Sequence, residues 1–60
     1  MVQEKILVVD DERLIRWTLT EKLSGWGYAP VEADTVAAAI AKFEAEQPVA
    51  VLLDITRPVR

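Results

Sequence analysis

The sequence contains neither cysteine nor histidine. The first absence excludes a disulfide framework and thiolate metal sites, and the second excludes imidazole ligands and a histidine general base. A metal site in this chain would therefore have to use oxygen ligands.

An excess of basic residues and a long apolar run are also absent. Seven Lys and Arg residues stand against ten Asp and Glu residues, which gives a net charge of −3. No positive field is available to hold a nucleic-acid backbone. The apolar run near the N-terminus is short and interrupted by Asp10, unlike a membrane span or a signal peptide. We therefore expect a cytoplasmic chain with no direct contact to nucleic acid or membrane.

The length limits the chain to one small domain. Its 60 residues are close to the size at which apolar burial only just outweighs chain entropy. We treat residues 1–60 as a single domain.

Two apolar runs predict buried strands. Residues 6–9 and 49–53 are continuous apolar stretches, the first of them mostly β-branched, and each is followed by aspartate. Such runs are typical of parallel strands that are buried on both faces. Residues 28–33 predict a weaker strand between these two, the second in chain order. Pro30 places it at a sheet edge because proline cannot donate a ladder hydrogen bond.

The segment between the strands predicted at residues 6–9 and 28–33 has helical periodicity. Residues 12–24 predict an amphipathic helix, with Gly25 or Gly27 available as its left-handed stop. Its apolar stripe consists of Ile15, Leu19, Leu23 and Trp26.

A second helix is predicted after Asp34, which is a suitable N-cap residue. Val36, Ile40 and Phe43 form its apolar stripe, and Pro48 ends it because the residue before a proline avoids helical angles.

The alternation of strands and helices predicts an α/β fold with a parallel sheet and right-handed crossovers. In a flavodoxin-like half domain the spatial strand order would be 2-1-3.

Three carboxylates are predicted to meet at one edge of this sheet. Asp10 and Asp11 follow the first strand, and Asp54 follows the third. Ligands of open α/β sheets bind at the carboxyl ends of the strands. Because clustered carboxylates repel one another, the cluster needs a cation or protonation, and oxygen ligands favour Mg²⁺ or Mn²⁺.

These motifs also resemble a known family. The receiver domains of bacterial two-component response regulators have similar first and third strands, matched here by Ile6-Leu7-Val8-Val9-Asp10-Asp11-Glu12 and by Val51-Leu52-Leu53-Asp54-Ile55 followed by Pro58. The whole chain looks like the N-terminal half of such a domain. The Leu14-Ile15-Arg16-Trp17 segment is similar to receivers of enhancer-binding transcriptional activators.

The resemblance implies a role in phosphorelay signal transduction. It makes Asp54 the phosphoacceptor, to which a sensor histidine kinase would transfer a phosphoryl group. It makes Asp10, Asp11, Asp54 and the main-chain carbonyl of Thr56 the ligands of Mg²⁺. A complete receiver would add two strands and three helices with a hydroxyl residue and a lysine that bind the phosphoryl group. We expect a truncated receiver whose phosphorylation is weak unless a partner completes the fold.

The sheet of a truncated receiver would be incompletely covered. The third strand would have an unpaired edge, and apolar faces next to it would be exposed to water. We therefore predict a homodimer, in its simplest form joined by antiparallel pairing of the two third strands.

Other functions remain as alternatives. A non-catalytic homodimerisation module derived from a receiver would keep the fold without signalling. The Asp54-Ile55-Thr56 stretch resembles the nucleophile motif of haloacid-dehalogenase-type phosphatases, but Thr56 stands where that family has its second aspartate, so no enzyme is expected. A nucleotide-binding half domain is disfavoured because acids, and no glycine-rich loop, follow the first strand.

Overall fold

The computed structural model describes residues 3–53 of the chain. Three strands and two helices alternate along these residues, as the sequence predicts. In chain order they are β1 (Lys5–Val9), α1 (Arg13–Gly25), β2 (Ala29–Ala33), α2 (Val36–Glu46) and β3 (Ala50–Leu53).

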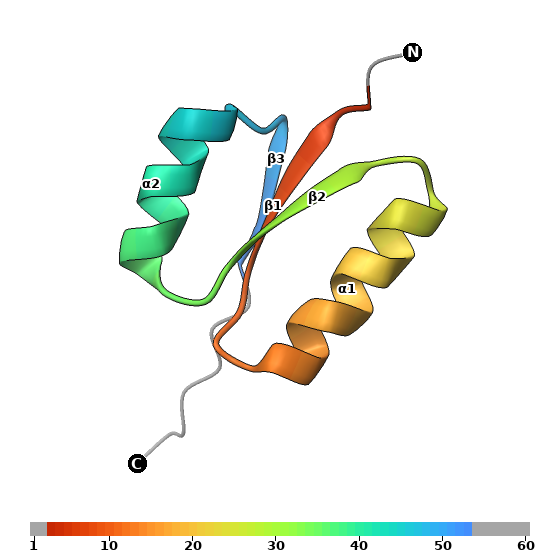
Figure 1. The fold of residues 1–60 in the computed structure, drawn as a ribbon, viewed down its shortest axis with the longest axis horizontal. Coiled ribbons are helices and arrows are strands. Elements are labelled where there is room, and N and C mark those ends of the chain that lie inside the picture. Colours follow the sequence, from red (N-terminus) through yellow and green to blue (C-terminus); the bar gives the residue numbers. More distant parts are fainter. Residues whose placement is uncertain (1–2, 54–60) are drawn as a thin grey trace.

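The strands form one parallel sheet in the order β2-β1-β3 (Figure 1). The predicted flavodoxin-like half domain with strand order 2-1-3 is therefore confirmed. Pro30 lies in β2 at an edge of the sheet, where its missing N–H is tolerated, as predicted.

The central strand β1 separates two apolar clusters. Successive side chains of a strand point to opposite faces. Ile6 and Val8 pack with Leu23 of α1 on one face, while Leu7 and Val9 pack with Ala33 and the start of α2 on the other. The two helices therefore cover opposite faces of the sheet (Figure 1). The prediction that residues 6–9 are buried on both faces is confirmed.

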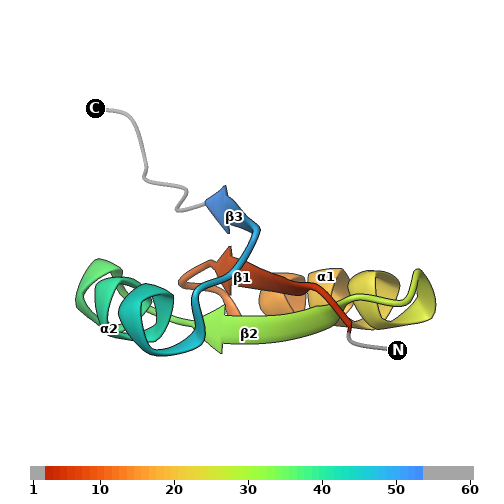
Figure 2. The same ribbon diagram turned by 90° about the horizontal axis from the view of Figure 1, so that it is seen from above.

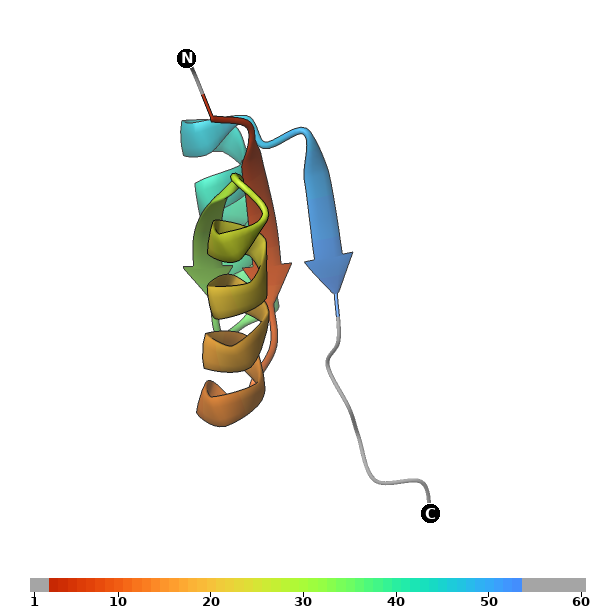
Figure 3. The same ribbon diagram turned by 90° about the vertical axis from the view of Figure 1, so that its right-hand side faces the viewer.

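The third strand has a different environment from the one predicted for residues 49–53. All four residues of β3 are exposed, so burial on both faces is wrong for this strand. Both helices pack against β1 and β2, whereas β3, among the five described elements, packs only against β1 (Figures 2 and 3). The expected exposure of apolar side chains beside the third strand is confirmed.

The first helix begins and ends one residue later than the predicted range 12–24. Glu12 is its N-cap residue, and its side chain makes no capping hydrogen bond. Of the two candidate glycines, Gly27 has the left-handed conformation, with φ of 92°, while Gly25 belongs to the helix. Trp26 lies beyond the helix and is 70% exposed, so its predicted place on the apolar stripe is wrong.

The predicted N-cap of the second helix is corrected by one position. Thr35, and not Asp34, precedes the first helical residue, and its Oγ1 accepts a hydrogen bond of 3.0 Å from the Ala38 amide. The helix ends at Glu46, where Gln47 adopts the left-handed conformation directly before Pro48.

An ion pair joins the start of β1 to the end of α2. Lys5 Nζ lies 2.8 Å from Glu46 Oε1 at the surface. The hydrogen bond and the charge of Lys5 hold the pKa of the Glu46 carboxyl below its ordinary value. Neither helix in residues 3–53 is long and apolar enough to cross a membrane.

Candidate carboxylate site at the carboxyl ends of the strands

All three strands end at the same level of the sheet. Val9, the last residue of β1, is in register with Ala33 of β2 and with Leu53 of β3. The next residues in the sequence are Asp10, Asp34 and Asp54, respectively. The chain leaves β1 between two strands that lie on opposite sides of it, and such a switch point is where open α/β sheets bind ligands.

The main chain and side chain of Asp10 are tightly held. Asp10 is 1% exposed, and its amide donates a 3.1 Å hydrogen bond to the Ala33 carbonyl. Its Oδ1 accepts a 2.8 Å hydrogen bond from the Glu12 amide. This bond across two residues is an Asx turn, which directs the chain from the strand into α1.

The second carboxylate oxygen of Asp10 is left without a partner. Within residues 3–53, Asp10 Oδ2 is the buried side-chain oxygen or nitrogen that makes no hydrogen bond. Burying an unpaired carboxylate oxygen is costly unless a cation or a proton compensates for it. The residues present therefore fit a cation at this position, because a hard divalent cation favours carboxylate oxygen ligands.

Asp11 has the opposite environment. It follows Asp10 directly, does not belong to any helix or strand, and is exposed. A cation held between the two carboxylates would be reachable from solvent on the Asp11 side. This suits Mg²⁺, which usually keeps several water ligands in proteins.

Arg16 is a site residue that the sequence did not indicate. Sequence periodicity placed it away from the apolar stripe of the first helix, but its Nη1 donates a 2.8 Å hydrogen bond to the Asp10 carbonyl. Its Nε lies 3.0 Å from Glu32 Oε1. Its spacing of six residues from Asp10 carries no recognisable signal, so only the folded structure reveals this contact.

The remaining predicted ligands are Asp54 and Thr56. Both lie outside the described residues, so the predicted three-carboxylate cluster and the Thr56 carbonyl ligand stay predictions. Within residues 3–53 no group of three or more acidic side chains is arranged to hold a metal ion. Of the predicted site, the structure therefore places Asp10 and Asp11.

Comparison with known proteins relates nearly the whole chain to regulators of transcription. No model of a known protein family matches it. It is 43% identical over 58 residues to the probable transcriptional regulator ycf27 of Porphyridium aerugineum and 45% identical over 56 residues to that of Guillardia theta. These matches cover 97% and 93% of the chain, but 24% and 22% of the relatives.

The probable ycf27 regulator of Cyanophora paradoxa gives a similar match, with 45% identity over 56 residues. The chain thus spans about a quarter of the length of the curated relatives it matches. Homologues of this α/β chain are thus probable ycf27 transcriptional regulators, each of which is about four times as long.

Proposed function

We propose that this chain is a receiver-type module of phosphorelay signal transduction, in which Asp54 accepts a phosphoryl group from a sensor histidine kinase. Asp10 and Asp11, with Asp54 and the Thr56 carbonyl, would hold Mg²⁺. The observation that carries the proposal is the buried Asp10 carboxylate, whose Oδ2 has no partner in the described part of the chain.

The strand register supports the pairing of this carboxylate with Asp54. Val9 and Leu53 are opposite each other in β1 and β3, and the two aspartates are the residues that follow them. Parallel neighbours that end in register bring the following residues to one edge of the sheet. Two acidic motifs that are 44 positions apart in sequence, at Asp10 and Asp54, would thereby serve one site.

The proposed reaction uses the Asp54 carboxylate as nucleophile. One of its oxygens attacks the phosphorus of a phosphohistidine in line with the bond to be broken, the phosphorus–nitrogen bond breaks, and the histidine leaves with the electron pair of that bond. The product is an aspartyl phosphate. Bound Mg²⁺ supplies positive charge that offsets the charge on the phosphoryl oxygens. Asp10 and Asp11 would hold this ion.

The relatives support a regulatory output. The matched proteins are described as probable transcriptional regulators, and the chain corresponds to about a quarter of each. We propose that the module controls transcription through a further part of the whole protein. The assignment to enhancer-binding activators stays a prediction from the Leu14-Ile15-Arg16-Trp17 segment.

The test is labelling of the full chain with acetyl phosphate, read by the mass of the intact protein. We expect a mass increase of one phosphoryl group in a fraction of the chains, in line with the weak phosphorylation expected from the sequence. The increase should require Mg²⁺ and disappear in Asp54→Asn. Asp34→Asn is the matched control, because Asp34 follows β2 at the same edge of the sheet and should not affect labelling.

Absence of Mg²⁺-dependent labelling, together with no effect of beryllofluoride on the protein, would contradict the proposal. The non-catalytic homodimerisation module would then be favoured. That alternative expects Asp54→Asn to leave association unchanged and Mg²⁺ to have little effect on stability.

A further inference from the structure

Arg16 connects three elements at the carboxylate site. From α1, its guanidinium donates from Nη1 to the Asp10 carbonyl at 2.8 Å and from Nε to Glu32 Oε1 at 3.0 Å. The Arg16 side chain is 15% exposed, whereas that of Glu32 in β2 is 49% exposed. A mostly buried side chain thus joins the first helix, the residue after β1 and the edge strand β2.

The bond to the Asp10 carbonyl restricts the peptide group that joins Asp10 to Asp11. Because a peptide group is planar, fixing its carbonyl oxygen also fixes the direction of the Asp11 amide and the start of that residue. The Asp10 amide is already held by the Ala33 carbonyl. With both ends of Asp10 anchored, the main chain from which the two neighbouring carboxylates extend is held in place.

Charge and position predict opposite effects of Arg16 on cation binding. A guanidinium close to a cation site repels the cation, although the Glu32 carboxylate partly offsets that charge. If Arg16 acted only through its charge, removing it would strengthen cation binding. If it acts by holding the Asp10–Asp11 peptide, removing it weakens binding.

We propose that Arg16 is a positioning residue, which holds the Asp10–Asp11 peptide so that the unpartnered Asp10 Oδ2 and the Asp11 carboxylate bind one Mg²⁺ ion together. This inference rests on the proposed function, because it assigns the cation that the phosphoacceptor site requires. Arginine suits the task since its planar fork can donate to a carbonyl and a carboxylate at once, which a lysine ammonium cannot do in the same geometry.

The experiment measures Mg²⁺ affinity of the full chain by calorimetric titration with the metal alone. Arg16→Gln is expected to weaken binding roughly tenfold or more, as is usual when a residue that orients a metal ligand is lost. Arg13→Gln is the matched control, since it removes the same charge from the first turn of the same helix. It should leave the affinity unchanged or slightly raised.

Two further measurements separate positioning from general stability. Without metal, the nuclear magnetic resonance signal of the Asp11 amide should shift in Arg16→Gln and stay unchanged in Arg13→Gln. Arg16→Lys keeps the charge and loses the fork, so its Mg²⁺ affinity should lie between those of the wild type and Arg16→Gln. If Arg16→Gln does not fold, the Mg²⁺ affinity of Arg16→Lys compared with that of the wild type tests the positioning role.

Wild-type affinity in either Arg16→Gln or Arg16→Lys overturns the positioning role while leaving the proposed function intact. A wild-type chain that binds no Mg²⁺ overturns both. The two failures are distinguishable because the wild-type titration is read first.

Discussion

Adjacent aspartates at the end of β1 have different environments. Asp10 is buried and anchored by hydrogen bonds through its amide, its carbonyl and Oδ1, whereas Asp11 is exposed. The sequence predicted that both belong to a cation site because they follow a strand that ends at the same sheet edge as the strand before Asp54. It could not predict which of them is buried, because burial depends on how Ala33, Glu12 and Arg16 surround the end of the strand.

Asp10→Asn should stabilise the metal-free chain by about 1–2 kcal/mol, because a neutral amide is less costly to bury than an unpaired carboxylate. The same substitution should abolish stabilisation by Mg²⁺. Urea denaturation with and without Mg²⁺ measures both effects. Asp11→Asn serves as the control for metal-free stability, since an exposed residue should change it little. A metal-free Asp10→Asn chain less stable than the wild type would contradict this account.

At the level of elements, similar sequence patterns led to different environments. Residues 6–9 and 49–53 are both apolar runs followed by aspartate, yet β1 is buried and β3 is exposed. Such an apolar run predicts a strand but does not indicate how many neighbouring helices and strands cover it. The exact start of a helix is also hard to infer from the sequence. Asp34 and Thr35 are adjacent, and both are good N-cap residues.

Thr35→Ala should lower the free energy of unfolding by about 1 kcal/mol, because it removes the hydrogen bond that Thr35 Oγ1 accepts from the Ala38 amide. Asp34→Ala, one residue earlier, should change it by less than about 0.5 kcal/mol. Chemical denaturation of the two variants compares these values. A larger loss in Asp34→Ala than in Thr35→Ala would show that the cap is wrongly assigned.

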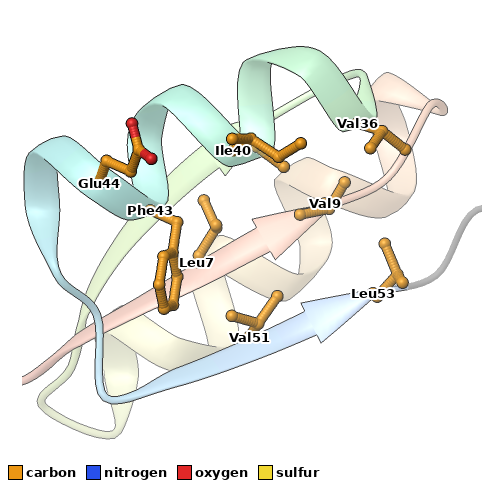
Figure 4. Close-up of a pocket in the computed structure, with 9 residues that line it drawn as sticks. Leu7, Val9, Val36, Ile40, Phe43, Glu44, Val51 and Leu53 are labelled. Carbon is orange, nitrogen blue, oxygen red and sulfur yellow. The ribbon is translucent and has the colours of Figure 1, made fainter.

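At the level of the whole molecule, an apolar groove lies between α2 and the strands. Figure 4 shows side chains of α2, β1 and β3 that point into it. Several of them are large and between 44% and 67% exposed, including Ile40, Phe43, Val51 and Leu53. Monomeric proteins seldom expose a continuous apolar surface of this kind. The homodimer predicted from the sequence would use the adjacent edge of β3, and it stays a prediction.

Sedimentation of the 60-residue chain at micromolar concentration tests this prediction, with a reversible dimer as the expected result. Val51→Lys places a charge on the exposed edge strand and should raise the dimer Kd roughly tenfold, equivalent to about 1.4 kcal/mol. Trp26→Lys is the control, because Trp26 is an exposed apolar residue that does not line the groove. A folded wild-type monomer throughout the concentration range would rule out the dimer.

The sequence by itself determined the order of elements along the chain, their assembly into a parallel sheet and the position of Asp10 and Asp11 after β1, whereas the spatial order 2-1-3 was inferred from the flavodoxin type of fold. These features follow from local periodicity, from turn residues and from the handedness of crossovers, all of which are encoded in short stretches of chain. Only the tertiary structure decided that Asp10 is buried with a free Oδ2, that Arg16 holds its carbonyl and that β3 is exposed. Those features depend on which side chains from distant segments come together, and no local pattern specifies that.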